Sequence, residues 1–237
     1  MNRNQSDRSS RLIEFIAGAK AILPLVVGVI PFGIIFGTLA RSSGLSAGAA
    51  IAMSAFVFAG SAQFLALSLI AAQTALPIII LTTFVVNLRH LLYSLSLMTH
   101  VRHLSPIWKV VLGFWLTDEV FAVAIARYLK EDSSKYKHWY YIGAAIFMYC
   151  NWQISTLLGL TLNHSIPNIT NWGLDFAMSV TLIGMVIPYV KNRSMVVTVF
   201  VSGITALLTR SFPYRSNLIV ASIAGITAGM LFPKTNI

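Results

Sequence analysis

The sequence predicts an all-α polytopic membrane protein with about eight transmembrane helices. Of its 237 residues, 57% are hydrophobic and only 10% are charged, and the mean hydropathy is +0.76. A soluble domain is roughly 45–50% apolar and 25% charged, so a soluble globule could not bury this much apolar surface. Alternating strand patterns are missing, and lipid excludes open sheet edges. This composition excludes a soluble enzyme and a disordered chain, and the single cysteine excludes a disulfide scaffold.

Eight segments approach the about 20 apolar residues that a helix needs to cross a bilayer. The seventh is short and is compatible with a tilted or re-entrant helix. The six charged residues before the first segment indicate a cytoplasmic N-terminal segment, residues 1–20, followed by a single transmembrane domain, residues 21–237. The eight segments are Ala21–Ala40, Ala47–Ala72, Leu76–Met98, Val110–Tyr128, Trp139–Leu162, Trp172–Val190, Ser194–Thr209 and Asn217–Phe232.

Basic residues in the short loops predict the orientation, because cytoplasmic loops carry an excess of Lys and Arg. If every segment crosses and the N-terminus is inside, eleven basic residues lie inside and five outside. This predicts that both termini are cytoplasmic. The weak point is the loop Thr99–Ile107, which places Arg102 outside. The net charge of +10 is therefore mainly a topology signal, and nucleic-acid binding has no separate support.

A faint internal repeat pairs segments one to three with segments four to six and leaves two further helices. Phe32 to Arg41 resembles Phe121 to Arg127. An odd number of helices in a unit inverts the second copy, as in many secondary transporters. Chance similarity between apolar helices is the alternative.

Three charged residues fall at membrane depth: Arg89 in the third segment, and Asp118 and Glu119 in the fourth. Each costs at least about 2.5–3.5 kcal/mol to insert and is usually functional. A purely structural pairing of Arg89 with one carboxylate is one explanation. The other carboxylate is then left over, and a buried unpaired carboxylate readily takes up a proton. Asp118 and Glu119 are thus candidates for proton coupling, with His90 as a relay because histidine titrates near neutral pH.

Polar residues surround Arg89 and also occur in the second segment. On a helix Arg89 shares one face with Tyr93, and Asn87 lies on the neighbouring face. In the second segment Ser61 and Gln63 lie among small residues that allow close approach, by a packed helix or by a substrate. Paired glycines such as Gly33 and Gly37 indicate helix packing, and we expect Asn151 and Gln153 to join helices. The candidate substrate-binding residues are Arg89, Asn87, Tyr93, Ser61, Gln63, Phe32 and Phe64.

Four motifs occur in one order along the chain: Gly28-x-x-Pro31-Phe32, Phe58-Ala59-Gly60-Ser61-Ala62-Gln63-Phe64, Asn87-Leu88-Arg89-His90-x-x-Tyr93-Ser94 and Thr117-Asp118-Glu119. Together they resemble the AzlC family, the large permease subunit of two-component branched-chain amino acid exporters. The resemblance runs from about Gly18 to the C-terminus, and the second and third motifs are the most specific.

The resemblance implies a carrier of the bacterial inner membrane that exports leucine, valine and isoleucine, and in some members methionine. It also implies a small membrane subunit of the AzlD type and coupling to the proton gradient. In this interpretation the substrate's carboxylate meets Arg89 or backbone N–H groups at a helix break. Its ammonium meets Asp118 or Glu119, and its side chain lies against Phe32 and Phe64.

Two other classes of function are open. One is a channel or carrier for another small amphipathic solute in the lipid bilayer. The other is an intramembrane enzyme, for example with Ser61 and His90 as a dyad. The sequence has no His-Glu-x-x-His, nucleophile-elbow or phosphate-loop pattern. We therefore expect no enzymatic activity, no metal and no cofactor.

Overall fold

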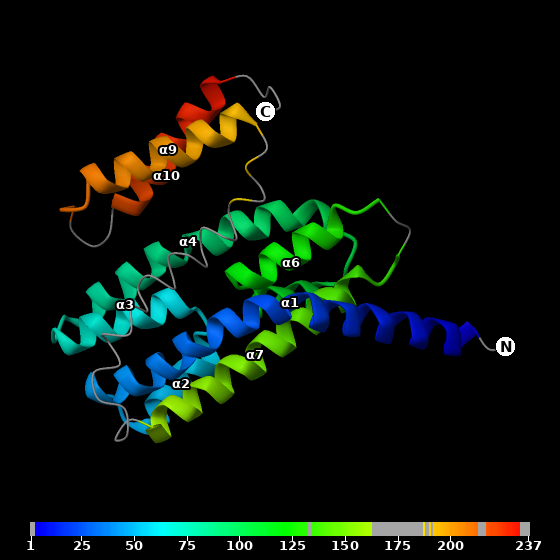
Figure 1. Ribbon diagram of the computed structural model, residues 1–237, viewed down its shortest axis with the longest axis horizontal. Helices are drawn as coiled ribbons and strands as arrows, with labels where there is room; N and C mark the ends of the chain where they lie inside the picture. Colours follow the sequence, from blue (N-terminus) through cyan, green and yellow to red (C-terminus); the bar gives the residue numbers. More distant parts are fainter. Residues whose placement is uncertain are drawn as a thin grey trace.

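The computed structural model describes residues 3–131, 134–162, 187, 190, 192–212 and 217–232. The prediction of an all-helical chain is confirmed for this part (Figure 1). Residues 10–42 and 76–101 form helices long and apolar enough to cross a membrane. Most of the sixth predicted segment, Trp172–Val190, lies outside the described residues. The helices are α1 (Arg3–Ser42), α2 (Ala47–Phe56), α3 (Gly60–Ala71), α4 (Leu76–Val101), α5 (Pro106–Phe114), α6 (Asp118–Tyr128), α7 (Lys137–Leu162), α9 (Arg193–Leu208) and α10 (Asn217–Leu231).

Helices α1 and α7 form the central pair and run parallel. Glycines on both helices let their backbones touch. A Cβ added to Gly18 would lie 1.9 Å from the carbonyl oxygen of Tyr140. A Cβ added to Gly159, near the other end, would lie 1.9 Å from the carbonyl oxygen of Ile34. Residue numbers therefore rise in the same direction along both helices, which lie side by side in Figure 1.

The second predicted segment is a hairpin of two half-helices, α2 and α3. Helix α2 approaches the middle of α7, where the ring of Phe58 lies 4.9 Å from that of Tyr149. Helix α3 then runs back toward the end of the molecule where α2 began. The ring of its Phe64 lies 6.2 Å from that of Phe36, which is one turn beyond Phe32 on α1. The two half-helices thus enter and leave at the end of the molecule where α1 and α7 finish.

The fourth predicted segment is a second hairpin, α5 and α6, which enters from the opposite end. The ring of Trp108 on α5 lies 4.8 Å from that of His138, in the first turn of α7. The chain reaches the middle at Trp115, whose ring lies 6.1 Å from Tyr149. Helix α6 returns, and its Tyr128 stacks on His100 near the end of α4 at 5.4 Å.

The hairpins correct the predicted topology. Each hairpin enters and leaves at the same end of the molecule. The loop Thr99–Ile107 therefore lies at the same end as residues 134–136 and the start of α7. Placing Arg102 and Lys109 on the opposite side was wrong, since that assignment assumed that every apolar segment crosses. Within residues 10–162, this end now holds Arg11, Lys20, Arg102, Lys109, Arg127, Lys130, Lys135 and Lys137, and the other end holds Arg41.

The predicted repeat is not tested, because most of its last segment lies outside the described residues. In the predicted repeat, the second segment corresponds to the fifth. The breaks instead occur in the second and fourth segments, and α7 runs unbroken from Lys137 to Leu162. The pairing of segments one to three with four to six stays a prediction.

Helices α9 and α10 form an antiparallel pair at the side of the body (Figure 1). Ser194 Oγ donates to the carbonyl of Gly229 at 2.5 Å, and a Cβ on Gly225 would lie 1.8 Å from Ser202 Oγ. The turn after α9 lies beside α3 and α4. Its residues Arg210 and Phe212 line a cavity together with residues of those two helices.

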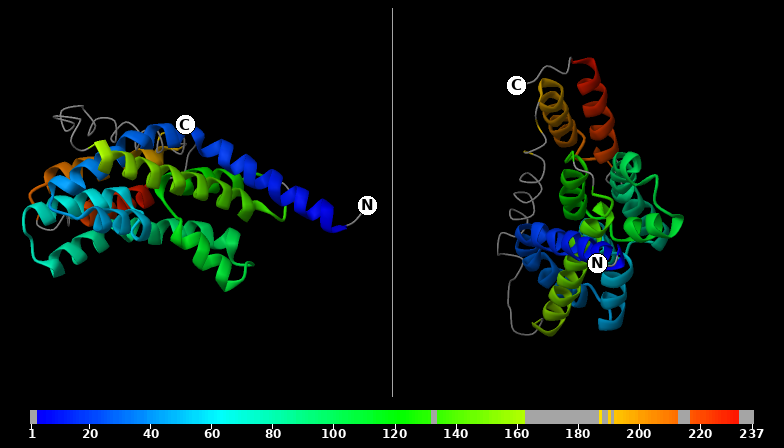
Figure 2. Two further views of the ribbon diagram at one scale, coloured as in Figure 1. Left: turned by 90° about the horizontal axis from the view of Figure 1, so that it is seen from below. Right: turned by 90° about the vertical axis from the view of Figure 1, so that its right-hand side faces the viewer.

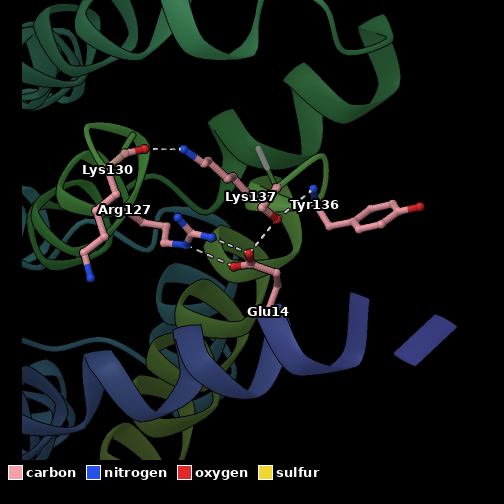
Figure 3. Close-up of polar contacts among 6 residues, drawn as sticks. Glu14, Arg127, Lys130, Tyr136 and Lys137 are labelled. Carbon is pink, nitrogen blue, oxygen red and sulfur yellow. Dashed lines mark hydrogen bonds and ion pairs between the residues drawn. The ribbon is translucent and has the colours of Figure 1, made fainter. Parts of the chain in front are cut away.

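Helix α1 has no break at residue 20, where the predicted membrane domain begins. Its first turns project beyond the other helices (Figure 2). Glu14 is buried and forms an ion pair with Arg127 of α6 (Figure 3). Ser134 Oγ donates to the same carboxylate at 2.6 Å. The division into a cytoplasmic segment, residues 1–20, and a membrane domain stays a prediction, but Glu14 shows that the first segment packs on the bundle.

Candidate functional site

A cavity of about 90 Å³ lies where the tips of the two hairpins meet the middle of α1, α4 and α7. Five segments that are far apart in the sequence therefore supply its wall. The lining residues are Val29 and Phe32 of α1, Phe58–Ser61 and Phe64 of the first hairpin, Arg89 and His90 of α4, Thr117–Glu119 of the second hairpin, and Met148 and Trp152 of α7.

The tip of the first hairpin exposes the start of α3 to this cavity. Phe58 has a φ of +41°, an uncommon value for a residue other than glycine, which turns the chain sharply. Ala59 occupies the N-cap, and no side chain accepts a hydrogen bond there. The first N–H groups of a helix lack intrahelical partners and carry a partial positive charge. A ligand anion could bind at this uncapped end.

Small residues let this tip pack tightly against α7. A Cβ added to Gly60 would lie 3.3 Å from the indole ring of Trp152. Ser61 Oγ is buried and has no hydrogen-bond partner among the described residues. The small-residue motif of the second segment therefore serves packing, and it also leaves a polar atom at the cavity.

The tip of the second hairpin presents two carboxylates at the start of α6. Thr117 is the N-cap, and its side chain accepts a hydrogen bond from the N–H of Val120 at 3.3 Å. Asp118 and Glu119 follow in the first turn. The positive end of the helix dipole stabilises negative charge at these positions, which explains how two adjacent carboxylates can occur deep in an apolar bundle.

Asp118 binds Arg89 and Tyr93, both from α4. Arg89 Nη2 lies 3.1 Å from Asp118 Oδ2, and Tyr93 donates to Asp118 Oδ1 at 2.6 Å. Tyr93 is itself stacked on Phe121, with ring centroids 4.4 Å apart. Glu119 has no cationic partner within ion-pair distance in the described part of the chain. This agrees with the predicted count of one cation for two carboxylates.

Seven of the ten predicted site residues line the cavity: Phe32, Ser61, Phe64, Arg89, His90, Asp118 and Glu119. Tyr93 does not line it but donates a hydrogen bond to Asp118, which does. Gln63 is fully buried, and neither its amide nitrogen nor its oxygen has a partner among the described residues. Asn87 likewise leaves its amide oxygen unpaired and does not line the cavity.

Sequence reasoning missed the two α7 residues Met148 and Trp152, which complete the apolar wall. Both are almost fully buried. Nothing in an apolar segment marks them in advance, because they resemble ordinary core residues. The predicted helix-joining role of Gln153 is confirmed, since its Nε2 donates to the carbonyl of Ser54 at 3.1 Å. The Ser61–His90 dyad is not formed, because Ser61 Oγ has no hydrogen-bond partner in the described part of the chain, which includes His90.

A model of a protein family, described as AzlC protein, matches residues 24–166. The chain therefore belongs to the AzlC family. The match includes α4 and both hairpins, so it covers every residue that lines the cavity. No solved structure matches this AzlC protein.

Several relatives match nearly the whole length of this AzlC protein. "Inner membrane protein YgaZ" of Escherichia coli K12 is 30% identical over 92% of this chain and 88% of its own length. An uncharacterized membrane protein of Archaeoglobus fulgidus is 30% identical over 91% and 94%, respectively. "Branched-chain amino acid transport protein AzlC" of Bacillus subtilis is 26% identical over 77% and 70%. The chain is therefore a membrane protein of a transport-related family.

Proposed function

We propose that this protein exports branched-chain amino acids, leucine, valine and isoleucine and also methionine, as the large subunit of a two-component carrier. The observation that carries the proposal is the composition of the cavity at the hairpin tips. It joins an apolar wall, an uncapped helix start and a carboxylate without a cation. These three features complement the three parts of an amphipathic amino acid.

The substrate's carboxylate would bind at the start of α3, next to Ser61. Helix starts bind carboxylates through free N–H groups, and broken membrane helices in transporters use the same device. Arg89 is held by Asp118 through Nη2, but its Nε is buried without a partner. Arg89 therefore supports the site by fixing α4 to the second hairpin and can add one further donor.

The substrate's side chain would lie against Phe32, Phe64 and Met148. A cavity of about 90 Å³ is smaller than the engineered cavity of about 150 Å³ that holds benzene. This size favours a branched aliphatic side chain over an aromatic one. A whole amino acid then needs some separation of the tips, which fits a carrier that closes around its substrate.

The ammonium group and the coupling proton would compete for Glu119. Asp118 already has two partners, whereas Glu119 has no cation, so Glu119 is the carboxylate that can exchange. His90, which lines the same cavity, would relay the proton. Loss of the proton would favour binding of the ammonium, and protonation would favour its release.

The opposed hairpins support alternating access, because each one separates the cavity from a different end of the molecule. The end with the start of α1 holds nearly all of the basic residues in residues 10–162, which supports a cytoplasmic position for this end, with the protein in a bacterial inner membrane. We include a small membrane subunit of the AzlD type in the proposal, on the family's resemblance alone.

The proposal is tested in bacterial cells that lack their own branched-chain exporters. The cells are loaded with dipeptides of leucine, valine, isoleucine or methionine, and external free amino acids are followed over time. The chain is produced alone, with its small subunit, and as Ser61→Ala and Glu119→Gln variants. We expect faster, saturable release that requires the small subunit and is reduced in both variants. Unchanged release from a well-produced complex would overturn the proposal, and release without saturation would indicate a channel.

A further inference from the structure

A second cavity, of about 290 Å³, lies between the ends of α4 and α6 and the start of α7. It is separate from the cavity at the hairpin tips, and the two share no lining residue. Its wall is mainly polar. The residues that matter are Lys135, Lys137, His100, His103, His138 and Tyr128.

Tyr128 places an unsatisfied hydroxyl at this cavity. The residue is 8% exposed, and its hydroxyl has no hydrogen-bond partner in the described part of the chain. Its ring is held by stacking on His100, with centroids 5.4 Å apart and an angle of 17°. A buried hydroxyl without a partner is unfavourable, so a ligand atom that accepts a hydrogen bond would stabilise this arrangement.

The cavity is electropositive, since none of its described lining residues is acidic. Glu14 of α1, which contacts the cavity-lining Ser134, is paired with Arg127 and does not line the cavity (Figure 3). Burial lowers the pKa of His138, and the nearby His103 and Arg11 lower it further. The contribution of His103 and Arg11 indicates a positive potential at this residue, which would favour an anion.

The two lysines lie where the chain enters α7, Lys135 just before the helix and Lys137 as its first residue. Lys137 Nζ donates to the carbonyl of Lys130 at 2.6 Å, and Ser134 Oγ donates to Glu14 (Figure 3). These contacts tie the start of α7 to the chain just after α6, and the cavity-lining Ser134 to α1. The lysines therefore belong to a shaped site and are not only part of a solvated basic surface.

Aromatic rings mark the level of this cavity. Trp108 lies 4.8 Å from His138 and 5.4 Å from Trp139. Tryptophan gathers at the headgroup level of membrane proteins, and clusters of basic residues on the cytoplasmic side bind anionic headgroups. The cavity is therefore at the level where phosphate groups are abundant.

We propose that this cavity binds the phosphate group of an anionic ligand, either a phospholipid headgroup or a soluble phosphate. Lys135 and Lys137 supply charge, and the Tyr128 hydroxyl donates a hydrogen bond to a phosphate oxygen. Lysine binds phosphate as a point charge, and hydrogen bonds to ionised groups are stronger than neutral ones. The inference does not depend on the transported solute.

The test measures binding by the purified full-length complex, without any transport assay. One arm adds inorganic phosphate to the protein in nanodiscs of phosphatidylcholine. The other compares nanodiscs of phosphatidylcholine with nanodiscs that contain phosphatidylglycerol. The thermal unfolding midpoint reports binding in both arms. The test variant is Lys135→Gln with Lys137→Gln, and the matched control is Arg102→Gln with Lys130→Gln, two exposed residues at the same end that do not line the cavity.

We expect stabilisation in at least one arm, and the responding arm identifies the source of the phosphate. The test variant should bind about tenfold more weakly or worse, because two charge-assisted contacts are lost, and the control should change by less than about twofold. Tyr128→Phe removes only the hydroxyl and should weaken binding about threefold, so the test stands even if the double variant folds poorly. No stabilisation in either arm, or equal losses in test and control variants, would overturn the proposal.

Discussion

Arg89 and Asp118 should be energetically coupled, and a double-mutant cycle measures this directly. Asp118→Asn leaves the guanidinium of Arg89, whose side chain is 25% exposed, with no anion to pair with. It also weakens the hydrogen bond that Tyr93 donates to residue 118. Breaking a buried pair costs about 3–5 kcal/mol, and partial exposure reduces this to about 2 kcal/mol. The weaker Tyr93 bond adds about 1 kcal/mol, so we expect about 3 kcal/mol for Asp118→Asn.

Arg89→Gln should lower the free energy of unfolding by about 2 kcal/mol, because Tyr93 still donates a hydrogen bond to Asp118. The double variant should cost about 3 kcal/mol rather than the sum of about 5, which gives a coupling energy of about 2 kcal/mol. The assay is denaturant-induced loss of helical circular dichroism in micelles. As a control, Asp118→Asn is combined with Thr38→Val, which removes a distant hydrogen bond to Gly159. If the Arg89 and Asp118 effects add within about 0.5 kcal/mol, the ion pair has no energetic role and the reasoning fails.

Three further predictions address packing, coupling and selectivity. Gly159→Ala should lower the free energy of unfolding by about 1–3 kcal/mol because its Cβ meets a backbone carbonyl of α1, whereas Gly203→Ala, with nothing within 4 Å, should be neutral or stabilising in the same assay. Glu119→Gln should leave residual release that no longer responds to an imposed pH gradient in cells or proteoliposomes; a full gradient response in this variant would assign the proton elsewhere. Met148→Ala should enlarge the cavity and shift release from leucine toward phenylalanine, with a stability loss of about 2–5 kcal/mol; an unchanged substrate ranking would remove Met148 from the substrate pocket.

The sequence predicts the helices well but not the path of the chain. Apolar runs locate α4, α7 and the end of α1 closely, since length and hydropathy decide which helices can cross, but α1 begins at Arg3, well before the predicted start at Ala21. The breaks at Phe58 and Trp115 are hidden, because each falls in a short apolar run, Phe56–Ala59 and Phe114–Leu116, that could equally continue a spanning helix. The charge of Arg102 was the one sign in the sequence that the topology was wrong. Arg102 fitted the predicted outside loop poorly, whereas it now lies at the end of the described helices that holds most of the other basic residues.

The site was predictable to the extent that polar residues are conspicuous in apolar segments. Arg89, Asp118 and Glu119 attract notice for this reason, and the structure brings all three to one cavity. The partner of Arg89 was not predictable, since adjacent carboxylates point about 100° apart on a helix. Apolar wall residues such as Trp152 gave no signal, because only three-dimensional packing distinguishes them from lipid-facing or core residues.

The half-helices also limit how the chain can enter a membrane during synthesis. They have 10, 12, 9 and 11 residues, so each is about 14–18 Å long against a hydrocarbon core of about 30 Å. Neither hairpin tip can rest in lipid, because its unpaired backbone groups need a protein environment. The second hairpin gains that environment from α7, for example where Tyr141 donates to the carbonyl of Leu112 at 2.7 Å. Helices α1 and α4 are made earlier and already contact α6, but since α7 is made after α5 and α6, the protein environment of this hairpin is complete only once the ribosome has made α7.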